Sequence, residues 1–235
     1  GLNGVSAQGT TQNRNTNISA FLVHDFSPSG SLNFRTQLGV TRLDFYQNTA
    51  LVTASNMIGA ETNVDQAGSQ AVEHNRLIQH DKGFFVQEEV NFGDKVIATV
   101  GLRGDKSSNN GDVNKFYYYP KANIAVNLHE FGLWDAAALS QVKLRAAYGE
   151  AGNFAVFGSK YTSLTPVVID GLPGSEIDPD KGNTQLGPER QKELELGFDV
   201  GLLNNRVSLD FTHYTKTVED MLLAARTPSS GGFTT

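Results

Sequence analysis

Apolar and polar residues alternate in several separate segments of this chain. The clearest is "ELELGFDVGLLNNRVSLDFTHY", residues 193–214. Every second residue from Leu194 to Leu202 is apolar, and after the Asn pair at 204–205 the alternation resumes from Val207 to Phe211. Period-two alternation gives a β-strand one apolar and one polar face. Because Asn tolerates the positive φ of a type I′ turn, the segment predicts a hairpin with Phe198 opposite Phe211. The apolar face of this hairpin must be buried against protein or lipid.

The other face of the same hairpin is strongly charged. The predicted register places Asp199 directly opposite Asp210, with Glu193 and Glu195 further along the strand. Like charges directly opposed are unfavourable unless water screens them. We therefore expect this face to be wet.

The same alternation recurs in further segments of the chain. Short turns and long aperiodic segments separate these alternating segments from one another. The expected turns lie at Pro28–Gly30, which would place Phe26 opposite Leu32, and at Gly93–Asp94. Residues 215–226 either extend the last strand or begin a short helix. The alternating segments span residues 17–26, 31–43, 83–92, 95–104, 116–128, 141–149 and 193–214.

Long loops are expected at residues 46–82, 105–115 and 150–190, where the periodicity is absent. Tight turns and long loops alternate, so all the long loops should lie at one end of an antiparallel sheet. Outer-membrane barrels have this asymmetry, whereas a β-sandwich seldom does. Aromatic residues at both strand ends, Tyr117–Tyr119 and Phe131 with Trp134, would suit two interfacial girdles. The expected fold is an all-β, antiparallel up-and-down transmembrane barrel wall, incomplete, with about eight strands.

Composition narrows the classes of function. The 235 residues carry 19 basic and 25 acidic side chains and a net charge of −6, which argues against a nucleic-acid surface. There is no cysteine, so thiolate chemistry and disulfides are excluded. The chain starts without Met and ends in a loop-like composition, and we expect it to be a piece of a longer protein.

No motif in the sequence indicates a catalytic site or a metal-binding site. The five histidines show no i, i+4 helical pair, and no G-x-S-x-G elbow occurs. Asp178, Asp180 and Glu189 have partial EF-hand spacing, but Gly182 and Asn183 occupy positions that the motif assigns to a ligand and to the turn glycine. We expect neither an enzyme nor a bound cofactor.

Three segments resemble the barrel of SusC/RagA-type TonB-dependent outer-membrane receptors. They are "LRAAYGEAGN" (144–153), "GFFVQEEVNFGDKVIATVGLRGDKSS" (83–108) and residues 183–223. The most specific part is N-x-x-L-x-P-E followed by an E-L-G-F-D strand and a short Asn-rich turn. The residues that match are Asn183, Leu186, Pro188, Glu189, Glu195, Leu196, Gly197, Phe198 and Asp199.

The resemblance implies a barrel of about 22 strands that holds a plug and imports oligosaccharides or peptides. Residues 1–235 would form part of one barrel domain, and the plug has no counterpart in this sequence. The implied partners are the TonB complex, contacted through the missing plug, a SusD-like surface lipoprotein, and outer-membrane lipid. The implied location is the outer membrane of a Gram-negative bacterium. The alternative is a soluble or surface-exposed β-sheet binding module, such as an adhesin or carbohydrate-binding module.

Two groups of residues are candidates for contact with a ligand or with the lumen. Loop aromatics can stack on sugar rings, although packing within the loops explains them as well. Charged residues on the polar face would line a wet lumen whether or not they touch a ligand. The candidate ligand-contacting aromatics are Tyr46, Phe154, Phe157 and Tyr161. The candidate lumen-facing residues are Glu193, Glu195, Asp199, Asp210, Lys143 and Arg145.

Overall fold

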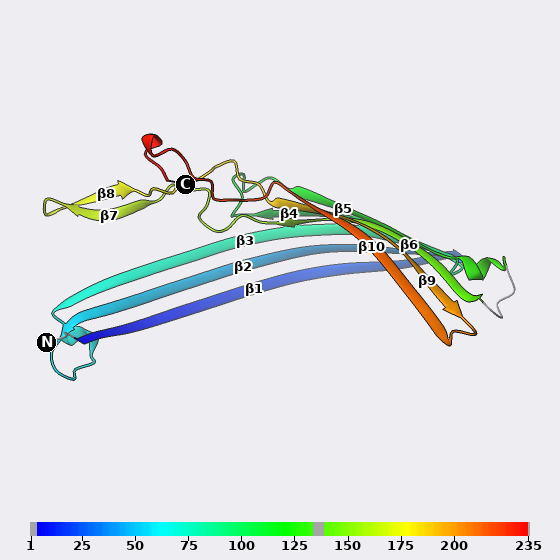
Figure 1. Cartoon of the computed structure of the whole chain (residues 1–235), viewed down its shortest axis with the longest axis horizontal. Helices are drawn as coiled ribbons and strands as arrows, with labels where there is room; N and C mark the ends of the chain where they lie inside the picture. Colours follow the sequence, from blue (N-terminus) through cyan, green and yellow to red (C-terminus); the bar gives the residue numbers. More distant parts are fainter. Residues whose placement is uncertain (1–3, 134–138, 235) are drawn as a thin grey trace. The chain divides into compact units, whose positions relative to one another are not determined.

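A computed structural model describes residues 4–133 and 139–234 and shows a chain built almost entirely of β-strands (Figure 1). Among these residues, eight strands form one sheet in the order β1-β2-β3-β4-β5-β6-β9-β10, and β7 and β8 form a separate two-stranded sheet. The expected up-and-down topology of about eight strands is confirmed. The strands are β1 Gly4–Ser29, β2 Leu32–Met57, β3 Ser69–Phe92, β4 Val96–Ser107, β5 Tyr117–Asn127, β6 Leu139–Asn153, β7 Leu164–Ile169, β8 Leu172–Ile177, β9 Glu189–Leu202 and β10 Val207–Glu219. Three 3-10 turns, η1 Val64–Gln66, η2 Leu128–Phe131 and η3 Ser229–Gly231, complete the elements.

The chain divides into two compact units. One consists of Gly1–Ile18 and Arg42–Asp81, and the other of Ser19–Thr41 and Lys82–Thr235. Strands β1, β2 and β3 contribute residues to both units.

The first unit overturns the expectation of a loop over residues 46–82. Strand β2 continues to Met57 and β3 begins at Ser69, so the connection covers only 58–68. Polar side chains pair across these strands: Thr11 with Thr49 at 3.3 Å between hydroxyls, and His74 with Asn48 at 2.7 Å. Period-two alternation appears only where one face is apolar and the other polar, and these extensions carry polar and apolar residues on both faces.

The short turns of the second unit lie side by side. The Gly93 N–H donates to Ser31 O at 2.6 Å, and the Asn127 N–H donates to Lys95 O at 2.8 Å. Within the last hairpin turn, Asn205 N–H donates to Ser140 Oγ at 3.0 Å. These contacts connect the short turns one after another, from the β1–β2 turn to the β9–β10 turn. The prediction that the short turns lie together at one end of the sheet is therefore confirmed for this unit.

The long connections of the second unit meet at the opposite end of its strands. The Gly111 N–H, between β4 and β5, donates to Leu186 O between β6 and β9, at 2.8 Å. Residues 150–190 are not one aperiodic loop, because β6 continues to Asn153 and the hairpin β7–β8 lies within this span. The connection 58–68 belongs to the first unit, and its place beside these loops stays a prediction.

The turn chemistry agrees with the sequence in two of three places. Gly93 and Asp94 both have positive φ, as do Asn204 and Asn205. In the first hairpin, however, Phe26 lies beside Phe34, with ring centroids 6.3 Å apart, and not opposite Leu32 as expected. A shift of two residues keeps every side chain on its own face, so the apolar faces still coincide.

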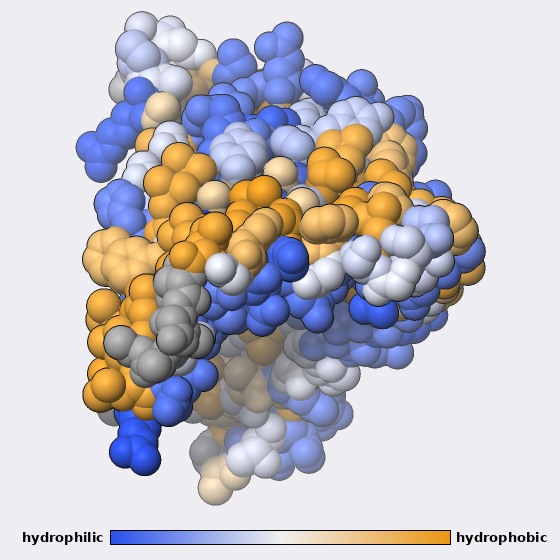
Figure 2. Space-filling model, turned by 90° about the vertical axis from the view of Figure 1, so that its right-hand side faces the viewer, coloured by the Kyte–Doolittle hydropathy of each residue, from blue (hydrophilic) through white to orange (hydrophobic). Residues whose placement is uncertain are grey.

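Strands β4, β5, β6, β9 and β10 share one apolar face. The register of β9 and β10 is the predicted one, and the Phe198 and Phe211 rings stack with centroids 5.4 Å apart. Figure 2 shows apolar atoms, in orange, gathered in a band across the view, with blue polar atoms above and below it. This apolar face consists of Val96, Ala98, Val100 and Leu102; Ala122, Ile124 and Val126; Val142, Leu144, Ala146 and Tyr148; Leu194, Leu196, Phe198, Val200 and Leu202; and Val207, Leu209 and Phe211.

Three further expectations concern single segments. Residues 215–219 continue strand β10, and no helix follows over residues 220–226. Glu88, which the alternation places on the apolar side, accepts a hydrogen bond from the Thr36 hydroxyl at 2.6 Å. Trp134, expected in an aromatic girdle, lies outside the described residues. Over the described residues, no helix is long and apolar enough to cross a membrane.

Candidate functional site

Arg145 is the centre of the charged face that lies opposite the apolar face. Its Nη2 donates to Asp199 Oδ1 at 2.8 Å, to Asp210 Oδ1 at 3.0 Å and to Thr212 Oγ1 at 3.2 Å. Glu195 Oε1 lies 3.8 Å from Nη1. The sequence predicted a wet face here because two aspartates are directly opposed. The structure adds that one guanidinium lies against both carboxylates and offsets their repulsion.

Gly197 makes this arrangement possible. It is the ladder partner of Arg145, and a Cβ at residue 197 would lie 3.2 Å from Arg145 Nη2 and 2.9 Å from Phe211 O. The missing side chain lets the guanidinium cross strand β9 and reach Asp210 on β10. The residues of the E-L-G-F-D pattern therefore point alternately to the two faces. Glu195, Gly197 and Asp199 lie next to the Arg145 guanidinium. Leu196 and Phe198 belong to the apolar face.

The two other predicted charged residues lie on the same face. Lys143 is the ladder partner of Asp199, and Glu193 pairs with Gly149 on one side and Lys216 on the other. The structure therefore places all six candidate lumen-facing residues on one side of β6, β9 and β10. That this side faces a lumen stays a prediction.

The N-x-x-L-x-P-E pattern forms a junction between the long connections. Asn183 Oδ1 accepts the Gln185 N–H at 2.9 Å, which turns the chain toward Leu186 and its contact with Gly111. Glu189 begins β9 and accepts the Leu222 N–H at 2.8 Å and the Asn153 side-chain amide at 3.2 Å. The first of these bonds, then the second, holds the pKa of Glu189 below its usual range. The pattern joins connections that follow β4, β6 and β10.

Lys160 is a buried residue that connects two of these long connections. Only 8% of this residue is exposed, and its ammonium donates to Ser108 O at 2.6 Å and Asn110 O at 3.2 Å. Asn109 Nδ2 donates to Ala155 O at 3.1 Å. A buried ammonium must be hydrogen-bonded to be tolerated, so these contacts fix the β4–β5 and β6–β9 connections to each other.

The four candidate aromatics lie in two different units of the chain. Tyr46 lies on strand β2 in the first unit, under the Arg14 guanidinium at 5.5 Å, and not in a loop. Phe154, Phe157 and Tyr161 lie in the β6–β9 connection, where Phe157 is 39% and Tyr161 61% exposed. The exposed rings are available to a ligand, and their role as contacts stays a prediction.

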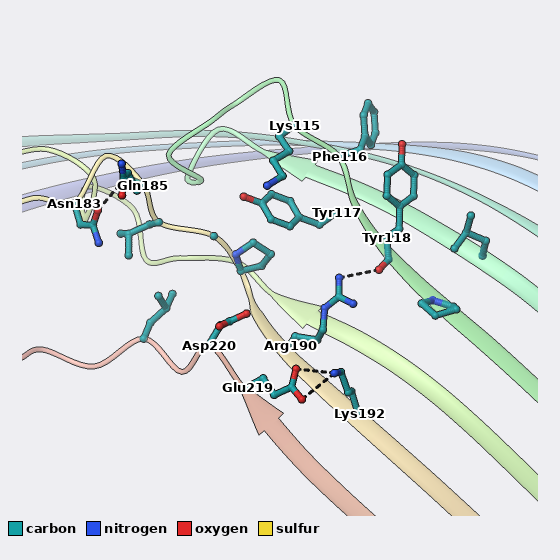
Figure 3. A pocket seen from close by; sticks show the side chains of 16 residues that line it. Lys115, Phe116, Tyr117, Tyr118, Asn183, Gln185, Arg190, Lys192, Glu219 and Asp220 are labelled. Carbon is teal, nitrogen blue, oxygen red and sulfur yellow. Dashed lines mark hydrogen bonds and ion pairs between the residues drawn. The ribbon is translucent and has the colours of Figure 1, made fainter.

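A cleft of about 990 Å³ lies at the long-loop end of the second unit. The sequence did not predict this cleft. The tyrosines at 117–119 and the N-x-x-L-x-P-E pattern were each recognised in the sequence, but nothing there indicated that they lie close together. Figure 3 shows side chains from β5, β9, β10 and two connections turned toward this space. The polar and aromatic residues that line it are Lys115, Phe116, Tyr117, Tyr118, Asn183, Gln185, Arg190, Lys192, Glu219 and Asp220.

Three basic residues line the cleft, Lys115, Arg190 and Lys192, and two of them, Arg190 and Lys192, form ion pairs with acidic residues. Lys192 Nζ lies 2.8 and 2.7 Å from the two carboxylate oxygens of Glu219. Arg190 donates to Glu150 at 2.6 Å. It also donates to Tyr118 O at 3.1 Å, as Figure 3 shows. Over the described residues, no group of three His, Asp or Glu side chains is placed to hold a metal ion.

The whole chain matches one protein family. Residues 1–235 match the model described as "TonB dependent receptor-like, beta-barrel". The chain belongs to this family. The match agrees with the resemblance carried by residues 183–223 and with the up-and-down sheet. The family is one of outer-membrane receptors and not of enzymes.

Curated relatives come from Formosa agariphila. TonB-dependent receptor P3 is 35% identical over 146 residues, which is 60% of this chain and 15% of the relative. TonB-dependent receptor P26 is 28% identical over 155 residues, 64% of this chain and 16% of the relative. The chain thus spans about one-sixth of the length of these relatives.

Solved structures share the fold. The RagAB peptide transporter superposes with a TM-score of 0.88 at 19% identity, over 97% of this chain and 26% of that one. The RagAB peptide importer in the "open-open" state gives 0.85 at the same identity, over 99% and 26%.

Proposed function

We propose that the parent of this chain is an outer-membrane receptor that takes up nutrients through TonB, and that this chain is part of its barrel wall. The observation that carries the proposal is the two-faced sheet of the second unit. One face is apolar from Leu194 to Leu202 on β9 and from Val207 to Phe211 on β10, and the other face holds the Arg145 cluster. A barrel between lipid and a wet lumen needs this combination.

The length of the apolar face suits a bilayer. From Leu194 to Leu202 the strand advances by about 27 Å at roughly 3.4 Å per residue. A strand tilt of about 40° reduces this to a depth of about 21 Å, close to the apolar band of about 25 Å in outer-membrane barrels. This agreement supports a lipid-facing apolar side over the soluble binding module.

Substrate and partners follow from the family as expectations. We infer that the substrate is an oligopeptide or an oligosaccharide, that a SusD-like surface lipoprotein assists its capture, and that the TonB complex acts through a plug that belongs to the rest of the parent protein. The RagAB structures, which are described as a peptide transporter, favour the peptide. The location follows as the outer membrane of a Gram-negative cell.

Uptake by whole cells tests this proposal. Cells that make the full-length parent should accumulate fluorescent oligopeptides or oligosaccharides, and cells without the parent or without TonB should not. Binding at the surface that never leads to TonB-dependent uptake would contradict the proposal and favour the binding module.

Point variants test the loop aromatics within the same assay. Tyr161→Ala should raise the substrate concentration needed for half-maximal uptake if its ring stacks on the ligand. Val156→Ala is the matched control, because Val156 is 75% exposed in the same connection and has no ring. If the two variants have equal effects on uptake, the Tyr161 ring does not contact the substrate.

A further inference from the structure

Two phenylalanine rings from strands β1 and β3 lie together across β2. The centroids of the Phe21 and Phe85 rings are 6.1 Å apart, and 64% of Phe21 is exposed. Gly39 on β2, the strand between them, makes this contact possible, because a Cβ at residue 39 would overlap the Phe85 ring. A glycine inside a strand often marks such a close approach. The two rings form an aromatic pair with an open surface.

The register of β1 and β2 shows which face of the sheet carries the aromatic pair. Side-chain contacts across these strands join Asp25 with Arg35, Ser27 with Asn33, and Phe26 with Phe34. The same register places Phe21 opposite Gly39, and alternation puts Phe21 on the side of Asp25. The aromatic pair therefore belongs to the polar face of these strands, and Phe26 lies on the other face.

Two glutamines form the adjacent row of the same face, one row closer to the short turns. Between β2 and β3, the Thr36 hydroxyl donates to Glu88 at 2.6 Å, and the contact beneath the aromatic pair has the same register. This register places Gln37 opposite Gln87, and both glutamines are partly exposed. A side-chain amide both donates and accepts hydrogen bonds, as a peptide group does. The rings are thus flanked by groups that can bind a peptide backbone.

An ion pair borders the rings on the side away from the glutamines. Arg103 on β4 donates to Asp105 through Nε at 2.6 Å and through Nη2 at 2.8 Å. It lies beside Gly83, two residues before Phe85 on β3, because a Cβ at residue 83 would lie 3.1 Å from Arg103 Nη2. The ion pair between β1 and β2 matches an arginine with an aspartate in the same way. The rings therefore present an apolar surface between paired charges.

The aromatic pair lies near the outward end of the apolar rows. Phe21 is eight residues from Ser29, the last residue of β1. At about 3.3 Å per residue this is about 26 Å along the strand, or about 20 Å in depth for a tilt of about 40°. The apolar band of an outer-membrane barrel is about 25 Å tall, so the rings belong to the upper part of the lumen. A substrate that leaves the long connections reaches this part first.

We propose that the Phe21–Phe85 pair is a subsite for an apolar side chain of an oligopeptide substrate. The side chain packs on the rings, and the amides of Gln37 and Gln87 form hydrogen bonds with the peptide groups beside it. The paired charges around the rings favour an apolar side chain over a charged one, which would lose water without gaining an ion pair. The inference deepens the proposed function and rests on it, because it requires the polar face to line the path of the substrate.

Peptide binding by the purified full-length parent tests the inference. The probes are two hexapeptides of alanine and serine that are identical, except that one carries a phenylalanine where the other carries an alanine. We expect the phenylalanine peptide to bind about fivefold more tightly, the usual size of one aromatic contact. Phe21→Ala should remove this preference and leave the affinity for the alanine peptide unchanged. Gly39→Ala, which displaces the Phe85 ring, should reduce the preference although both rings are kept.

Phe26→Ala is the matched control, because Phe26 is 55% exposed on the opposite face of the same strand. This variant should keep the preference for the phenylalanine peptide. The inference is overturned if the unmodified parent binds both peptides equally, or if the control loses the preference as Phe21→Ala does. It is also overturned if Phe21→Ala weakens both peptides to the same extent, which would show that the ring packs against another part of the parent.

Uptake by whole cells separates failure of the subsite from failure of the proposed function. TonB-dependent uptake of oligosaccharides by a parent that binds neither peptide would overturn the subsite and leave the proposed function intact. If neither oligosaccharides nor peptides enter through TonB, the proposed function fails and the subsite fails with it.

Discussion

A charge placed on the apolar face should destabilise the barrel far more than a charge one residue away. Leu209 and Ser208 are neighbours on β10, opposite Val200 and Gly201. Leu209 lies on the apolar face, whereas Ser208 lies on the charged face above a residue without a side chain. We therefore compare Leu209→Arg with Ser208→Arg in the full-length parent.

The expected cost follows from the position of Leu209. The apolar stretch of β9, Leu194 to Leu202, is centred on Phe198, which pairs with Phe211, and Leu209 lies two residues from that pair. Two residues correspond to about 7 Å along the strand and about 5 Å in depth. An arginine costs about 2–4 kcal/mol at the bilayer midplane and less toward the interfaces, so we expect about 2 kcal/mol for Leu209→Arg.

Ser208→Arg should cost less than about 0.5 kcal/mol, the usual range for an exposed substitution. Gly201→Arg would not serve as the control, because a Cβ there would lie 2.0 Å from Asn205 Oδ1. The assay is the free energy of folding into bilayers, measured by denaturant titration of the parent and both variants. Equal costs, or a larger cost for Ser208→Arg, would refute the assignment of faces.

Three further predictions concern the charged face and the loop junction. Arg145→Met should lower the melting temperature of the parent more than Lys143→Met, because only Arg145 separates paired carboxylates; equal shifts in a thermal melt would contradict this. Gly111→Ala should loosen the long connections, because a Cβ would lie 2.1 Å from a backbone oxygen, and faster limited proteolysis at the loops should report it. Glu189→Ala should lower the protection of the Leu222 amide in hydrogen exchange. In the unmodified protein that protection should be full above the ordinary pKa of a glutamate and decrease as the pH falls through the lowered pKa of Glu189; protection that does not change with pH would contradict this.

The sequence predicted those parts of the fold in which one strand face is apolar. The register of β9 and β10 follows from alternation and from two asparagines that accept positive φ, and the structure has the same pairs. The extensions of β1, β2 and β3 were missed because their apolar residues do not alternate with polar ones and fall on both faces. Hydrogen bonds such as that between His74 and Asn48 leave no periodic signal.

The candidate site was predicted only where it lies on strands. The charged residues around Arg145 could be assigned to one face, because alternation fixes the face of every side chain. The cleft could not be assembled, since Lys115 and Asp220 come from segments that meet only through the folded loops. Gly197 and Gly111 show the same limit: both are needed for close approaches that only coordinates reveal.

The face that meets lipid is the central claim, and site-directed spin labelling along β10 tests it directly. Single labels from Val207 to Val218 are placed in the full-length parent reconstituted into bilayers, and their collisions with oxygen and with a water-soluble nickel complex are measured. Oxygen accessibility should be highest at Leu209 and Phe211, and nickel accessibility at Ser208 and Asp210, with a period of two residues. Labels at Leu209 and Phe211 that are shielded from both reagents, or that collide mainly with nickel, would contradict a lipid-facing barrel wall.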